Sequence, residues 1–124
     1  MDKAELRSSM LKKRLMIEPN DAAGMSKVIT QKLLELDRIQ NASCVMAYCP
    51  YKNEPDLMGL VHALLDMGKS VALPYVTGDD SMIAVDYNYE SVMKSNLFGI
   101  PEAVIRNESE KVEPDVVLVP GVAF

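Results

Sequence analysis

Two carboxylates and an aromatic ring lie close together in the stretch Tyr51-Lys52-Asn53-Glu54-Pro55-Asp56. It follows an apolar run, Ser43 to Tyr48, that is typical of a strand covered on both faces. Because ligands of open α/β sheets bind beyond the carboxyl ends of strands, this loop is a candidate ligand site. A carboxylate that accepts two hydrogen bonds suits a ring with adjacent donors, such as an aminopyrimidine. Asp56 can instead cap the next helix, whereas Glu54 has no such structural duty, so Glu54 is the better functional candidate.

Two cations near the amino terminus form a second candidate. Lys3 and Arg7 are four residues apart, so on a helix they project from one face. At this spacing the two side chains can straddle a polyphosphate, with Arg7 as a fork and Lys3 as a point charge. The alternative is a solvated helix end, which is where charged side chains usually lie.

Phe98 is the third candidate, because it is one of only two Phe residues and stands in the Gly/Pro-containing segment 96–102. It can stack on a flat ligand, or it can anchor the loop against the core. Neither Gly-rich phosphate-binding pattern occurs in the chain. Cys44 and Cys49 are interpreted as free thiols in a reducing cytoplasm, and His62 as a surface residue.

Periodicity predicts the elements that position these residues. We expect helices over 2–16, over about 21–38 with a stripe from Met25 to Leu36, and over 56–67. We expect strands at 43–48, 70–74, 82–87 and 116–119, and a short helical piece at 90–94. The strand–helix–strand unit over 43–74 predicts two parallel strands with a right-handed crossover. The fold class is therefore a single α/β domain over 1–124, with a mainly parallel sheet flanked by helices on both faces in three layers.

The net charge and the distribution of apolar residues argue against several classes of protein. A net charge of −5 argues against a nucleic-acid surface, because phosphate binding needs clustered Lys and Arg. No apolar run approaches the roughly 20 residues that span a bilayer, and no apolar signal core begins the chain. The net charge and the absence of a long apolar run fit a cytoplasmic protein that binds small molecules.

Taken in order, the motifs resemble those of 5-formyltetrahydrofolate cyclo-ligase, also called methenyltetrahydrofolate synthetase. The resemblance runs through K-x-x-x-R at Lys3 to Arg7, A-Y-x-x-x-x-x-E-x-D at 47–56, G-K-x-V-x-L-P at 68–74, F-G-I-x-E at 98–102 and D-x-V-L-V-P-G-V-A-F at 115–124. It implies a ligase of one-carbon metabolism that uses ATP and Mg²⁺ to cyclise 5-formyltetrahydrofolate to 5,10-methenyltetrahydrofolate, releasing ADP and phosphate.

The resemblance also implies roles for individual residues. Lys3, Arg7, Pro120 and Gly121 would bind ATP, and Tyr51, Glu54, Asp56 and Phe98 would bind the folate. No catalytic group and no metal ligand is assigned. The family commonly has Thr after the position of Asp56, where this chain has Leu57.

A larger departure concerns a segment of the form R-x-G-x-G-x-G-Y-Y-D, which in the family follows the final Phe and surrounds the ATP phosphates. It does not occur in these 124 residues, so we expect the sheet to be incomplete at its carboxyl-terminal end and this chain alone to be impaired. Two alternatives stay open: a non-catalytic folate-binding or regulatory fragment, and an unrelated α/β sugar-phosphate enzyme that shares the sheet.

Overall fold

The computed structural model describes residues 2–78, 81–105 and 110–121. The helices are α1 (Lys3–Leu15), α2 (Pro19–Leu34), α3 (Asp37–Asn41) and α4 (Met58–Asp66). The strands are β1 (Cys44–Met46), β2 (Ser70–Gly78), β3 (Ser81–Tyr87), β4 (Met93–Ser95), β5 (Pro101–Ala103) and β6 (Val116–Val117). None of the helices in these ranges is long and apolar enough to cross a bilayer.

The main sheet is mixed, with two parallel pairings and one antiparallel pairing in the order β3-β2-β1-β6. Strand β1 is parallel to both neighbours, with Val45 opposite Val71 of β2 and Val116 of β6. Strand β3 returns antiparallel to β2, and β4 and β5 form a separate two-stranded sheet. The predicted α/β class, with a mainly parallel sheet and flanking helices, is confirmed. The expected three layers are not seen in the described part of the chain, because α2, α3 and α4 pack in one layer on the same face of the sheet.

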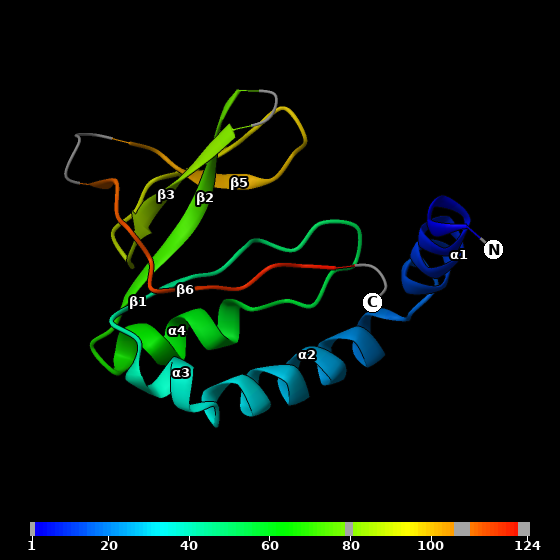
Figure 1. Cartoon of the computed structure of the whole chain (residues 1–124), viewed down its shortest axis with the longest axis horizontal. Helices are drawn as coiled ribbons and strands as arrows, with labels where there is room; N and C mark the ends of the chain where they lie inside the picture. Colours follow the sequence, from blue (N-terminus) through cyan, green and yellow to red (C-terminus); the bar gives the residue numbers. More distant parts are fainter. Residues whose placement is uncertain (1, 79–80, 106–109, 122–124) are drawn as a thin grey trace.

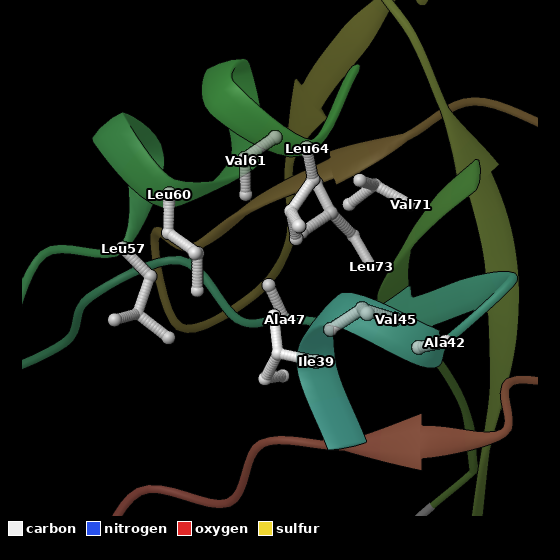
Figure 2. Packing of buried hydrophobic residues seen from close by; sticks show 10 residues of the cluster. All are labelled: Ile39, Ala42, Val45, Ala47, Leu57, Leu60, Val61, Leu64, Val71 and Leu73. Atoms are coloured by element: carbon white, nitrogen blue, oxygen red, sulfur yellow. The ribbon is translucent and has the colours of Figure 1, made fainter. Parts of the chain in front are cut away.

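The core lies between α4 and one face of the two central strands (Figure 2). Val45 and Ala47 alternate along β1 and the residue after it, as Val71 and Leu73 do on β2, so all four side chains point to this face. Helix α4 covers them with Leu57, Leu60, Val61 and Leu64, each at most 2% exposed. Helices α2 and α3 close the same layer with Ile29, Leu33, Leu34 and Ile39.

Helix α4, predicted over 56–67, runs from Met58 to Asp66 and is stopped at Gly68. The N–H of Gly68 donates to the carbonyl of Leu65 and that of Lys69 to Leu64, both at 3.0 Å. This pairing satisfies the last carbonyls of the helix and needs a left-handed residue, here Gly68 with φ of 81°.

The predicted carboxyl-terminal boundary of the second helix, near residue 38, is wrong. Helix α2 stops at Leu34, and Leu36 is extended, with φ of −73° and ψ of 132°, before α3 begins. The break lets Ile39 turn into the core at 1% exposure, whereas Leu36 stays 52% exposed. Met25 and Val28 of the predicted apolar stripe are also half-exposed.

The helical piece predicted at 90–94 is a turn followed by strand β4. The Asn88 side chain accepts from the Glu90 N–H at 2.8 Å, and the Ser91 hydroxyl accepts from the Asn88 N–H at 3.0 Å. These local hydrogen bonds favour a turn over a helix. Elsewhere β2 is longer than predicted, because it pairs with β3 as far as Gly78, and β1 and β6 are shorter.

Helix α1 does not lie on the rest of the molecule as an amphipathic helix is expected to. No residue of α1 is buried, and Leu6 and Leu15 are 41% and 53% exposed. Figure 1 shows α1 projecting beyond the amino-terminal end of α2, on the side where β1 and β6 end.

Candidate functional site

The carboxyl ends of β1 and β6 lie side by side and lead into two neighbouring segments. The N–H of Leu118 donates to the carbonyl of Met46 at 2.9 Å, so the segment after β6 runs along the one that follows β1. Figure 1 shows the two segments extending together away from the sheet. Pro120 and Gly121 therefore follow the same edge of the sheet as the loop from Pro50 to Asp56.

A tight turn gives this loop its shape. The side chain of Glu54 accepts from the Tyr51 N–H at 2.9 Å, and the Glu54 N–H donates to the Tyr51 carbonyl at 3.2 Å. Lys52 and Asn53 both have left-handed backbones, with φ of 50° and 62°. Asn tolerates this conformation and Lys does so at a cost, and such strain tends to persist at functional sites.

A hollow of about 350 Å³ separates the loop from the start of α2. Glu54 and Asp56 line it on the loop side together with Pro50 and Asn53, and Pro19, Ala22, Ala23 and Ser26 line it on the helix side. A smaller apolar hollow of about 140 Å³ adjoins it, with Arg14, Ile17, Met25 and Ile29 in its wall. The larger volume lies within the range of small-molecule sites.

Each of the two carboxylates uses one oxygen for structure. Oε1 of Glu54 accepts from Tyr51, and Oδ1 of Asp56 accepts from the Met58 N–H at 2.9 Å at the start of α4. The prediction that Asp56 is the N-cap is wrong: the N-cap of α4 is Leu57, which makes no side-chain cap hydrogen bond, and Asp56 accepts from Met58 from the position before it. The expectation that Glu54 has no structural duty is also wrong. Within the described part of the chain, no hydrogen bond engages Oε2 of Glu54 or Oδ2 of Asp56, so each remains available to a ligand.

Tyr48 and Cys49 are neutral groups beside these carboxylates. Burial raises the pKa of the Tyr48 phenol, and the Glu54 carboxylate raises it further, while Arg14 opposes the shift. Burial also raises the pKa of the Cys49 thiol, with a contribution from Asp56. A protonated phenol and a protonated thiol are suited to donating hydrogen bonds and not to nucleophilic attack.

Three residues that support the loop were not singled out from the sequence. Ser26, 8% exposed on α2, accepts from the Asp56 N–H at 2.9 Å. The Asn53 amide donates to the carbonyl of Arg14 at 2.7 Å, and Nε of Arg14 donates to the carbonyl of Lys52 at 2.9 Å. A Ser on the inward side of an amphipathic helix is a signal that could have found Ser26, because buried hydroxyls need partners. No pattern of spacing points to Arg14.

Phe98 is 66% exposed in the connection between β4 and β5, so it does not anchor that loop in the core. The Asn96 side chain shapes the connection by accepting from the N–H groups of Phe98 and Ile100, at 2.8 and 3.1 Å. Gly99 supplies a left-handed backbone there, with φ of 77°. Among the described residues, the hydrogen bond of Phe98 is local, to Asn96, and no hydrogen bond joins it to the loop at 50–56.

Lys3 and Arg7 lie on the exposed first turns of α1. In the described ranges neither side chain forms a hydrogen bond or ion pair, so no contact brings them to the loop. The same ranges contain no group of three or more His, Cys, Asp or Glu side chains that could hold a metal ion.

Together, these features define an α/β domain with a hollow of small-molecule size beside the loop that follows its central parallel strand. The sequence profile of the 5-formyltetrahydrofolate cyclo-ligase family matches residues 1–124. The chain belongs to this family. Membership of this family excludes the alternative that the chain is an unrelated α/β sugar-phosphate enzyme.

Two solved structures show the same relationship. The chain is 32% identical to 5,10-methenyltetrahydrofolate synthetase from Aquifex aeolicus, with a TM-score of 0.84 over 99% of this chain and 62% of that one. It is 26% identical to a 5,10-methenyltetrahydrofolate synthetase from Mycoplasma pneumoniae, with a TM-score of 0.61 over 70% of this chain and 54% of that one. The chain thus spans less than two thirds of the length of either structure. A search of curated protein sequences found no match.

Proposed function

We propose that this chain carries the folate-binding part of an enzyme that cyclises 5-formyltetrahydrofolate to 5,10-methenyltetrahydrofolate at the expense of ATP. The observation that carries the proposal is the match of the family profile to residues 1–124. The hollow beside Glu54 and Asp56 supports it by offering a site of suitable size and chemistry.

The two carboxylates suit the pyrimidine end of a folate. Oε2 of Glu54 and Oδ2 of Asp56 can accept from N–H groups on the edge of such a ring, and charge-assisted bonds of this kind are stronger than neutral ones. Tyr51, 39% exposed at the start of the turn, offers a ring face beside them. Phe98 would cover the folate from the β4–β5 connection.

The reaction then requires positioning more than a strong base. The formyl oxygen attacks the terminal phosphorus of ATP, the bond to ADP breaks, and a phosphorylated imidate-like intermediate forms. The second folate nitrogen attacks the formyl carbon, its proton leaves, and the carbon–oxygen bond breaks with release of phosphate. Holding the reacting groups in this arrangement accounts for much of the rate in such transfers.

ATP would lie beside the folate, at the end of β6. Pro120 and Gly121 follow the same edge of the sheet as the loop from Pro50 to Asp56, which we call the folate loop. Lys3 and Arg7 offer two cations on one face of α1. These cations would hold the phosphates. The described residues include no group of three or more His, Cys, Asp or Glu side chains that could hold a metal ion, and no residue is assigned to Mg²⁺.

Folate binding by this chain tests the proposal. We expect 5-formyltetrahydrofolate to bind in a calorimetric titration, and Glu54→Gln and Asp56→Asn each to weaken binding about tenfold or more, because a charged acceptor is lost. Both replacements keep an oxygen for the structural hydrogen bond. Glu35→Gln is the matched control, since Glu35 is exposed at the end of α2.

Turnover is followed by the absorbance of methenyltetrahydrofolate as it forms from 5-formyltetrahydrofolate and ATP. We expect little turnover from the 124 residues alone, because they contain no Gly-rich phosphate-binding pattern. Folate binding without any dependence on ATP would favour a non-catalytic folate-binding role. Absence of folate binding would contradict the proposal.

A further inference from the structure

Packing does not fix the orientation of helix α1. The helix contributes no side chain to the hydrophobic core, and all its residues are at least partly exposed. Burial of apolar side chains is what normally holds a helix against its neighbours. Some other interaction must therefore set where α1 points.

Three hydrogen bonds tie the carboxyl end of α1 to the turn of the folate loop. The Asn53 amide donates to the carbonyl of Arg14 at 2.7 Å and to that of Ile17 at 3.3 Å. In the opposite direction, Nε of Arg14 donates to the carbonyl of Lys52 at 2.9 Å. The partners are 36 to 39 residues apart in sequence, so these are tertiary links and not local capping.

The left-handed turn makes these links possible. With Lys52 and Asn53 both at positive φ, the chain reverses within two residues and presents the Lys52 carbonyl and the Asn53 amide to α1. Glu54 closes the same turn through Tyr51. A carboxylate proposed to bind folate and an amide that holds α1 are therefore adjacent residues of one rigid turn.

Arg14 has capacity for one more interaction. Its Nη1 is buried, and no partner for it is found among the described residues. A buried unpaired donor costs free energy, so a bound group that accepts from it would strengthen the link. Arg14 also lies in the wall of the small hollow beside Glu54.

We infer that Asn53 and Arg14 are positioning residues that couple the folate loop to the helix carrying Lys3 and Arg7. The inference rests on the proposed function, since it assigns folate to one side of the link and ATP to the other. Ordering of the turn by folate fixes α1, and α1 in turn presents its two cations to the phosphates. Reciprocal coupling of two ligands follows from any such shared element.

The substitution Asn53→Gly removes the hydrogen bonds from Asn53 to α1 and keeps the backbone turn. Glycine adopts the left-handed backbone freely but has no amide side chain, so the turn is retained and two of the three hydrogen bonds are lost. Spin labels at Ser8→Cys on α1 and Gln31→Cys on α2, in a background with Cys44→Ala and Cys49→Ser, report the orientation of α1. We expect Asn53→Gly to broaden the distance distribution about twofold or more, because α1 is then held by one hydrogen bond.

This first measurement needs no ligand, so its outcome is independent of the proposed function. An unchanged distribution in Asn53→Gly would overturn the link. Asn41→Ala, at an exposed position at the end of α3, is the control and should leave the distribution as in the parent protein.

The coupling itself is tested with a non-hydrolysable ATP analogue and 5-formyltetrahydrofolate. We expect Asn53→Gly to reduce by about fivefold or more the factor by which saturating folate increases affinity for the analogue. This factor compares analogue affinity with and without bound folate, so it does not depend on any change that the loss of Asn53 from the hollow makes to folate affinity itself. Arg14→Lys keeps the charge, loses the Nε donor and should weaken the coupling in the same direction. A coupling factor unchanged in both variants would refute the inference even if folate and nucleotide bind.

Discussion

The carboxylate of Asp115 fixes the start of strand β6 beside β1. Its two oxygens accept from the backbone N–H groups of Ser43 at 2.9 Å and Cys44 at 2.8 Å, and its own N–H donates to the Cys44 carbonyl. These hydrogen bonds hold the pKa of the Asp115 carboxyl below its ordinary value of 3.8. One side chain therefore sets the register of the strand that leads to Pro120 and Gly121.

Asp115→Asn should lower the melting temperature at neutral pH, because the amide offers one acceptor oxygen where the carboxylate offers two. The folded-state pKa lies below that of the unfolded chain, so the stabilisation is complete above the ordinary value of 3.8 and is lost as the pH falls through the lower folded-state pKa. The melting temperatures of the two proteins should therefore converge at acid pH. A gap that does not depend on pH, or a similar gap for Glu35→Gln, would contradict this account.

At the scale of the elements, the β1–α4–β2 unit carries the core. Residues next to each other in sequence determine where its helix ends. The apolar positions of α4 face β1 and β2, and Gly68 reverses the chain into β2. No atom lies within 4 Å of a Cβ added at Gly68, so only the backbone conformation there demands glycine. Gly24, in the interior of α2, has as much space and an ordinary helical backbone.

Matched replacements separate these two effects. We expect Gly68→Ala to lower the free energy of unfolding by about 1 kcal/mol, because alanine is strained at positive φ. We expect Gly24→Ala to raise it by about 0.5–1 kcal/mol, because alanine favours the helix interior. Denaturant unfolding of both variants measures the difference. Destabilisation by both replacements would show that space, and not backbone conformation, is limiting.

At the scale of the whole molecule, the structure has a packed body and a lightly held helix. Strands β1 and β2 are central in the sheet and carry fully buried side chains, whereas α1 carries none. We expect amide hydrogen exchange of β1 and β2 to require global unfolding, and that of α1 to proceed by local opening at much lower free energy. Exchange followed by mass spectrometry in mild denaturant checks this. Equal protection of α1 and β2 would contradict the description of α1 as held mainly by the turn at Lys52 and Asn53.

The sequence by itself determined the elements whose signals are local. The five apolar positions of the stretch 57–65, Gly68 as the helix end, and the apolar strand after Ser43 predict the parallel strand–helix–strand unit, and the structure has it. The motifs at 47–56 and 98–124 indicated the family, which the profile match confirms. Assignment of Tyr51, Glu54, Asp56 and Phe98 to folate, and of Lys3, Arg7, Pro120 and Gly121 to ATP, stays a prediction.

Only the tertiary structure decided the contacts between segments distant in sequence. The break after Leu34 depends on the burial of Ile39, and strand β4 depends on pairing with β5, which the helical propensity of 90–94 does not anticipate. Likewise, Ser26 supports Asp56 and Asn53 holds Arg14 because the folded chain brings them within hydrogen-bond distance. Periodicity and spacing describe one segment at a time, whereas these hydrogen bonds join residues 30 and 39 positions apart.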